Sequence, residues 1–184
     1  MSTPTHDPAL QNPPYRYVMV DIETLGTHPT TAPVLEIAAV PFSRVAAHPP
    51  FFYTHISYES NLAAGRLPDL STAVWWLQQH RRCPIDGTTP LLTALADFAK
   101  WATANTDANT EWYCKGTNFD PLILDDLLDS HLIKRPWKYH QWRDARTLQK
   151  FFNINPPNDQ RTTHDPTDDC IQQIIIIQKC FAAL

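Results

Sequence analysis

The chain has 184 residues, 43% of them hydrophobic and 11% aromatic, and it carries a formal net charge of −4. This size and composition exclude an intrinsically disordered chain and are typical of one globular domain. The negative net charge argues against a protein that coats nucleic acid through bulk positive charge.

The cysteines and the apolar runs limit where the protein can work. The four cysteines show no C-x-x-C spacing, so we expect reduced thiols rather than a zinc site or structural disulfides. No apolar run approaches the ~20 residues that span a bilayer, and the N-terminus lacks the basic-then-apolar order of a signal peptide. We therefore expect a cytoplasmic protein with no membrane partner.

The first part of the chain predicts an arm and then three strands. Residues 1–14 contain four prolines and predict a flexible arm, whereas residues 15–184 predict a single domain. Runs of apolar, β-branched and aromatic residues predict strands at 15–22, 34–40 and 51–57. Three strands so close in sequence suggest a meander.

The rest of the chain alternates helices with short strands. Ser71 is expected to cap a helix over 72–82, and Pro90 is expected to begin a longer helix. The remaining predicted elements are a strand at 111–115, a helix at 121–130, a short strand at 139–143, a helix at 145–152 capped by Asp144, and a last helix from about Thr167 to the C-terminus. This order predicts an α/β fold with a mixed sheet flanked by helices.

Two acidic side chains end the first predicted strand, in the stretch V-D-I-E-T-L-G. Successive side chains of a strand point to opposite faces, so Asp21 and Glu23 share one face while Ile22 points away. Two anions held this close need a counter-charge. An isolated D-x-E is common, however, and its ordinary interpretation is a strand end that reaches solvent.

Further acids lie at two other junctions of predicted elements. Asp120 lies between a strand, a glycine turn and a helix, where it can stabilise the helix dipole or project over the sheet edge. His164 lies on a loop, and Asp168 and Asp169 fall in the first turn of the last helix. We expect one of these two aspartates to cap the helix and the other to remain free for chemistry.

These residues, in the order D-x-E, N-F-D and H-x4-D, resemble the motifs of the DEDDh 3′→5′ exonucleases, which have a ribonuclease H-like fold. The resemblance covers about residues 15–180 and implies a central mixed five-stranded sheet. It also implies hydrolysis of phosphodiester bonds from the free 3′ end of RNA or DNA, with release of nucleoside 5′-monophosphates. The implied roles are metal binding by Asp21, Glu23, Asp120 and Asp169 and general-base catalysis by His164.

The resemblance implies two Mg²⁺ ions as the cofactor, with Mn²⁺ as a substitute. Such ions can serve both the attacking and the leaving oxygen of a phosphodiester. They are hard cations that prefer carboxylate and water oxygens, which four acids supply. A histidine with a pKa of about 6.5 can be neutral near pH 7 and accept a proton from the attacking water, so the rate is expected to rise with pH through its titration.

A narrower resemblance is carried by D-I-E-T-L-G, S-T-A-V-W-W-L, K-G-T-N-F-D and W-R-D-A-R-T. This order is similar to a small bacterial and phage branch that includes the mycobacterial ribonuclease acting on adenylated RNA and exonuclease VIII-like proteins. One departure is Pro166, which stands two places after His164, where the family usually has a small residue. Proline fixes its own φ angle and favours an extended backbone at the residue before it. It can therefore stiffen or displace the loop that carries the histidine.

Four residues are expected to contact the substrate. Thr24 and Leu25 follow the acids directly, so they can contact the terminal sugar and its base. Trp75 and Trp76 point about 100° apart on a helix, so one can face the sheet while the other, for which we take Trp75, stacks on a base; equally, both can fill the core or a subunit interface. Arg143 lies in the most basic neighbourhood of the chain and can pair with a phosphate, although an internal ion pair or a solvated surface fits equally.

Two alternatives to an active exonuclease stay open from the sequence. The domain could bind nucleic acid without catalysis, which the loss of an acid would favour, or it could be a proofreading-type partner of a polymerase. No acid is missing from the motifs, so the active enzyme is the favoured prediction. A homodimer is a further expectation, because relatives in the DEDDh family often pair.

Overall fold

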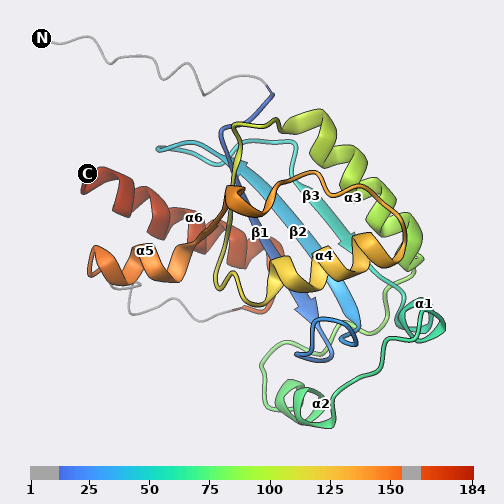
Figure 1. Ribbon diagram of the computed structural model, residues 1–184. Helices are drawn as coiled ribbons and strands as arrows, with labels where there is room; N and C mark the ends of the chain where they lie inside the picture. The colour runs from blue at the N-terminus through green and yellow to red at the C-terminus, as the bar shows by residue number, and fades with distance from the viewer. Residues whose placement is uncertain (1–12, 155–162) are drawn as a thin grey trace, which may run out of the picture.

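The computed structural model describes residues 13–154 and 163–184, and in this part of the chain five strands form a single sheet (Figure 1). The arm predicted over residues 1–14 lies almost wholly outside the described residues. The strands are β1 Tyr17–Thr24, β2 Val34–Phe42, β3 Phe52–His55, β4 Glu111–Cys114 and β5 Trp142–Asp144. Their order in the sheet is β3-β2-β1-β4-β5.

The sheet is mixed. β1, β2 and β3 are antiparallel neighbours and form the predicted meander, whereas β4 pairs parallel to β1 and β5 pairs parallel to β4. The predicted α/β fold with a mixed five-stranded sheet is therefore confirmed.

Helices fill most of the connections. They are α1 Tyr58–Ala63, α2 Leu70–Trp76, α3 Leu91–Asn105, α4 Asp120–Ser130, α5 Ala145–Phe151 and α6 Pro166–Ala182. All the predicted helices are present, and α1 has no counterpart among the predicted elements. Asp144 caps α5 as predicted, because its carboxylate accepts a hydrogen bond from the N–H of Arg146 at 2.9 Å. Within the described ranges, no helix is long and apolar enough to cross a membrane.

The predicted boundaries of α2 are wrong at both ends. Its N-cap is Asp69 rather than Ser71, and the helix ends at Trp76 rather than at residue 82. Beyond Trp76 the chain turns, so that Arg81 can reach the fully buried Glu36 of β2.

The predicted strand at 139–143 is also wrong in its first part. Tyr139–Gln141 form a 3-10 turn, and the strand β5 begins only at Trp142. The side chain of Gln141 closes this turn by accepting a hydrogen bond from the N–H of Lys138 at 2.7 Å.

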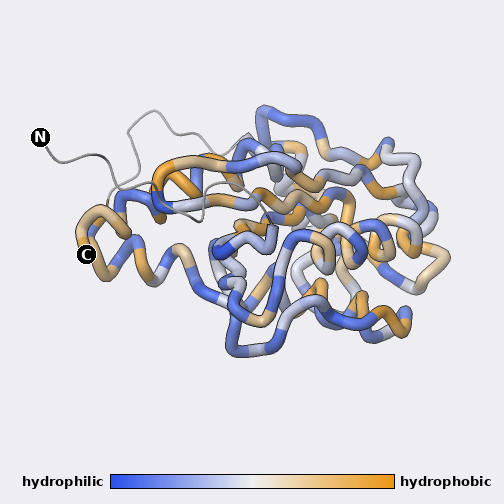
Figure 2. The backbone as a smooth tube through the Cα atoms, turned by 90° about the horizontal axis from the view of Figure 1, so that it is seen from above, coloured by the Kyte–Doolittle hydropathy of each residue, from blue (hydrophilic) through white to orange (hydrophobic). Residues whose placement is uncertain are grey.

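Two hydrophobic cores, one on each face of the sheet, hold β1 at the centre. Val18 and Val20 pack with α3 and α4, whereas Met19 packs with α5 and α6 (Figure 1). In Figure 2 the tube of α6 changes between hydrophobic and hydrophilic colours along its length, as expected for a helix with one face on a core. Since side chains alternate along a strand, Asp21 and Glu23 continue the row of Met19 on the face that α6 covers.

Candidate active site

Four carboxylates and one histidine, remote from one another in sequence, line a single cavity of about 550 Å³. They come from the end of β1, the start of α4, the loop before α6 and the first turn of α6: Asp21, Glu23, Asp120, His164 and Asp169. The topology explains this convergence. β1 and β4 are parallel and α4 follows β4, so the carboxyl end of β1 and the start of α4 meet at one edge of the sheet.

Hydrogen bonds from neighbouring elements orient Asp21 and Asp120. Gln173 of α6 donates from Nε2 to Oδ1 of Asp21 at 2.8 Å. The backbone N–H of Ile22 donates to Oδ1 of Asp120 at 3.3 Å, which ties the start of α4 to β1. Both acids are therefore held in place by the folded chain itself.

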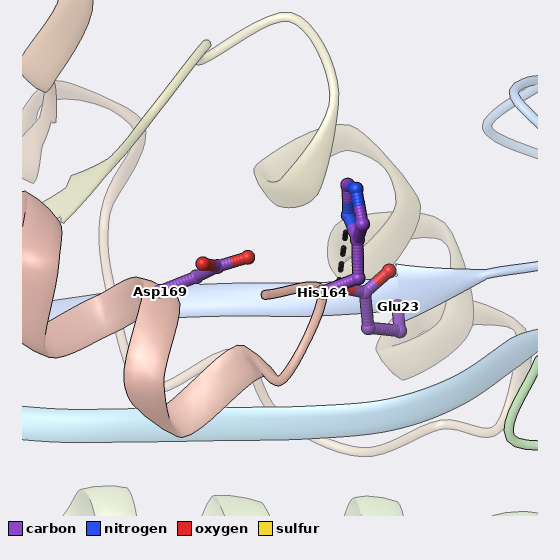
Figure 3. A group of neighbouring side chains, drawn as sticks. All are labelled: Glu23, His164 and Asp169. Atoms are coloured by element: carbon purple, nitrogen blue, oxygen red, sulfur yellow. Dashed lines mark ion pairs between the residues drawn. The ribbon is translucent and has the colours of Figure 1, made fainter. Parts of the chain in front are cut away.

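Glu23, His164 and Asp169 form the tightest group in the cavity (Figure 3). Each offers one ligand atom within 4.8 Å of the others, and Nδ1 of His164 lies 3.9 Å from Oε1 of Glu23. Oδ1 of Asp169 accepts a hydrogen bond from the N–H of Thr163 at 3.2 Å, which links α6 to the loop of the histidine. Among residues 13–154 and 163–184, this is the only such group of three; Asp21 and Asp120 line the same cavity outside it.

Pro166 does not displace His164 from the cavity. It is the first residue of α6, where its missing N–H costs no helical hydrogen bond. Asp165 is the N-cap, and its carboxylate accepts hydrogen bonds from two first-turn N–H groups at 3.0 and 3.2 Å. The prediction that Asp168 or Asp169 caps the helix is therefore wrong, because the proline holds the residue before it in the extended backbone of an N-cap.

Burial raises the pKa values of all four acids. Together with the charge of Asp120, it holds the pKa of Asp21 well above its usual value. Burial, followed by the charges of Asp21 and Asp169, raises the pKa of Glu23 to about 9. Burial also raises the pKa of Asp120 to about 7 and raises the pKa of Asp169. Such a cluster of oxygen donors fits a hard divalent cation, which would replace the bound protons.

The two tryptophans of α2 point in different directions, as the helix geometry predicts: one is buried and the other lines the cavity. Trp76 is 3% exposed, and its Nε1 donates to the carbonyl oxygen of Thr24 at 2.9 Å. Trp75 is 39% exposed and lines the cavity, with its ring centroid 4.7 Å from that of His164. Trp75 is therefore the one placed where a base could stack.

Thr24 and Leu25 differ in their placement. Thr24 lines a smaller cavity of about 370 Å³ that shares Glu23 and Trp75 with the larger one. Leu25 is buried against Leu35 and Trp76 and lines neither of these two cavities. The structure thus brings Thr24, but not the side chain of Leu25, to the edge of the site.

The basic residues of the cavity are Lys115 and Arg146, not Arg143. Arg143 donates to the carbonyl oxygens of His140 and Trp142, and it lies outside the cavity. The sequence offered one signal for Lys115, which directly precedes the G-T-N-F-D stretch. It offered no means of choosing Arg146 over Arg143, because both lie in the same basic neighbourhood.

A mixed sheet of this order, with four carboxylates and a histidine at the carboxyl end of its central strand, defines the DEDDh-type 3′→5′ exonucleases of ribonuclease H-like fold. Residues 16–181 match the Rv2179c-like 3′-5′ exoribonuclease domain, and the chain belongs to this family. The predicted family and the predicted class of enzyme are thereby confirmed. Membership implies dependence on a divalent cation, in agreement with the oxygen donors of the cavity.

Solved structures of similar fold include E. coli exonuclease I. Its complex with a dT13 oligonucleotide has a TM-score of 0.65 at 16% identity, covering 89% of this chain and 40% of that one. The zinc-bound form of its complex with single-stranded DNA has a TM-score of 0.66 at 14% identity, covering 91% and 42%. The chain thus spans about two fifths of the length of exonuclease I, and likeness at this identity shows the fold alone. A comparison with curated proteins finds no significant match.

Proposed function

We propose that the protein is a divalent-metal-dependent exonuclease that removes nucleotides from the 3′ end of RNA and releases nucleoside 5′-monophosphates. The observation that carries this proposal is the convergence of four carboxylates and His164 in one cavity. Membership of an exoribonuclease family favours RNA as the substrate, whereas E. coli exonuclease I, which has a similar fold, is seen in complex with DNA. A single domain over residues 15–184, a homodimer and a cytoplasmic location remain predictions.

The four carboxylates are the groups that would hold Mg²⁺ or Mn²⁺. Glu23 and Asp169 would hold a cation beside His164, and Asp21 and Asp120 would complete the set of ligands. When bound, a pair of such ions stabilises the charge that develops on the phosphoryl group and makes the water a stronger nucleophile.

His164 is the proposed general base. Burial lowers its pKa, so the imidazole is neutral near pH 7 and has a nitrogen lone pair free to accept a proton. The rings of Trp75 and Trp76, at 4.7 and 5.8 Å between centroids, restrict its rotation. The histidine is therefore held where it can accept a proton from a water placed between it and the carboxylates.

Trp75 is the proposed stacking surface for the terminal base. Stacking of a base on an aromatic ring contributes ~1–3 kcal/mol, so we expect Trp75→Leu to raise KM about tenfold. Because Trp75 also touches His164, kcat and KM must be measured separately. Tyr139→Leu is the control, since Tyr139 is 90% exposed and lies outside the cavity. An unchanged KM for Trp75→Leu would exclude the stacking role.

Lys115 and Arg146 are the proposed phosphate contacts. Neither lies within 4.0 Å of a carboxylate of the described residues, and the guanidinium of Arg146 donates to the carbonyl oxygen of Lys115 at 3.3 Å. Both cations line the cavity, and within the described ranges neither makes an ion pair with a carboxylate.

Arg146→Gln is expected to raise KM by about tenfold, because a charged hydrogen bond to phosphate contributes ~1.5–3 kcal/mol. The dependence of log KM on log salt concentration should also become shallower, by about 0.7 for a single-stranded substrate. Lys150→Gln removes an exposed charge from the same helix and should change neither quantity. Arg143→Gln tests the choice made from sequence, and a larger effect there than at Arg146 would contradict the assignment.

The proposed reaction is tested with 3′- and 5′-labelled RNA and DNA, single- and double-stranded, in Mg²⁺, Mn²⁺ or EDTA. A 3′ label should appear at once as a mononucleotide, whereas a 5′ label should shorten stepwise, and both changes should stop in EDTA. Faster hydrolysis of RNA than of DNA supports the proposed substrate, and the reverse order corrects it to DNA. Release of mononucleotide from the 5′ end would overturn the proposal.

A further inference from the structure

A carboxylate outside the proposed metal site lies on the strand next to it. Glu36 is the third residue of β2, is fully buried, and is the cross-strand partner of Glu23 in the antiparallel pair. A buried carboxylate is costly unless it is paired and hydrogen-bonded. Two side chains pair with the carboxylate of Glu36 and hydrogen-bond to it. Arg81 binds it with both terminal nitrogens, at 2.6 and 2.7 Å, and Tyr53 donates a hydrogen bond from its hydroxyl at 2.5 Å.

Arg81 makes a third contact, with the loop of the proposed general base. The same Nη1 that binds Glu36 also donates to the backbone carbonyl oxygen of His164, and Nη2 lies 4.0 Å from the carboxylate of Asp165. A planar guanidinium has five N–H donors in a fixed arrangement, so it can hold a carboxylate and a carbonyl oxygen together. One side chain thereby connects β2 to the loop before α6.

The backbone of His164 needs such a connection. Its φ is +55°, in the left-handed region that costs a residue other than glycine about 1 kcal/mol or more unless the surroundings impose it. The N–H of Thr163 is held by Asp169 on one side of the histidine. Arg81 holds the carbonyl on the other side, and the segment that carries Arg81 also supplies the rings of Trp75 and Trp76 that pack on the imidazole.

We propose that Arg81, itself fixed by Glu36, is a positioning residue that sets the loop conformation and hence the imidazole position of His164. The proposal rests on the proposed function of His164 as general base. Arg81 touches neither the attacking water nor the substrate in this scheme. It acts by holding the carbonyl of the histidine in the orientation that points the ring toward Glu23 and Asp169.

The alternative is that the Glu36–Arg81 pair stabilises only the fold, and kinetics separate the two. We expect Arg81→Ala to lower kcat by about 10–100-fold, the usual effect of losing a group that orients a site residue, with KM changed by less than about threefold. Arg81→Lys keeps the charge opposite Glu36 but cannot bind Glu36 with two nitrogens and also reach the His164 carbonyl, so its kcat should lie between those of Arg81→Ala and the parent.

The decisive measurement is the effect of Arg81→Ala on kcat in a protein that also carries His164→Ala. If Arg81 acts through the imidazole, Arg81→Ala should lower kcat there by less than about threefold, because there is no ring left to position. An equal fold loss in both backgrounds, or no loss in either, would overturn the proposal. A His164→Ala protein with the parent kcat would instead overturn the role of His164 itself, so the two failures are distinguishable.

Loss of Arg81 alone leaves a buried charge on Glu36 and can prevent folding. The double variant Glu36→Gln with Arg81→Gln avoids this, because it replaces the ion pair with two neutral amides and still removes the guanidinium from the carbonyl of His164. Its far-ultraviolet spectrum should match the parent, while kcat falls as in Arg81→Ala. Arg82→Ala is the control, since Arg82 is an exposed neighbour and should leave kcat unchanged in both backgrounds. A folded double variant with the parent kcat would contradict the proposal.

Discussion

Asp21→Asn is expected to lower kcat by about 1,000-fold and at the same time to stabilise the metal-free protein. The first effect follows because Asp21 is a proposed metal ligand, and losing about 4 kcal/mol of charge stabilisation in the transition state corresponds to that factor. The second follows because burial and the charge of Asp120 disfavour the ionised form of Asp21 in the folded chain. Asparagine keeps the acceptor oxygen for Gln173 and removes the repulsion.

The two opposite effects make this variant informative. A loss of activity through misfolding would lower the melting temperature, whereas loss of a metal ligand should raise it in EDTA at pH 8. The measurements are single-turnover hydrolysis of a 3′-labelled oligonucleotide and thermal unfolding without metal. Asp97→Asn, on the exposed side of α3, is the control and should change neither. Hydrolysis by Asp21→Asn at the parent rate would show that the ligand assignment is wrong.

The sequence predicts the positions of those site residues that follow from local sequence patterns. The two-residue spacing of Asp21 and Glu23 places both on one face of β1 whatever the partners of that strand are. The junction of strand, glycine and helix similarly places Asp120 at the sheet edge. All five residues of the DEDDh motifs line one cavity, and the functional assignment drawn from them stays a proposal.

The part that the sequence does not predict depends on contacts between distant segments. Glu36 lies in an apolar run that reads as an ordinary buried strand, and its partner Arg81 is 45 residues away in a segment predicted to be helical. No local pattern relates them. The choice between Arg143 and Arg146 likewise depends on tertiary structure, because Arg143 lies in β5 and outside the cavity, whereas Arg146 lies in the first turn of α5 and lines it.

The N-cap of α6 is a third feature that the sequence alone does not predict. Asp165, Asp168 and Asp169 are all suitable N-cap residues by type, so composition alone leaves the start of the helix undetermined. Pro166 decides it, because proline is favoured at the first helical position and restricts the residue before it. The result matters for the site: with Asp165 as the cap, Asp169 lies one turn into the helix and faces Glu23 and His164.

Divalent cations are expected to stabilise the folded protein, and more so at pH 8 than at pH 6. The pKa of Glu23 is raised to about 9 and that of Asp120 to about 7, whereas unfolded carboxyl groups titrate near 4. Between these values the folded chain binds more protons than the unfolded chain, so the free energy of unfolding of the metal-free protein falls as pH rises. Cations bind the deprotonated carboxylates, so protons compete with them less at pH 8.

The expected increase in the free energy of unfolding on cation binding follows from mass action. A cation at 100 times its dissociation constant adds about 2.7 kcal/mol, which for a chain of this length corresponds to a rise of about 5–10 °C in melting temperature. Melting curves with Mg²⁺, with Mn²⁺ and with EDTA at pH 6, 7 and 8 measure this rise in melting temperature. Activity should disappear in EDTA and return with either cation. Asp21→Asn should lose most of the gain, while Asp97→Asn should keep it. Equal melting temperatures with Mg²⁺ and with EDTA at pH 8, together with undiminished hydrolysis in EDTA, would mean that the buried carboxylates do not bind a cation.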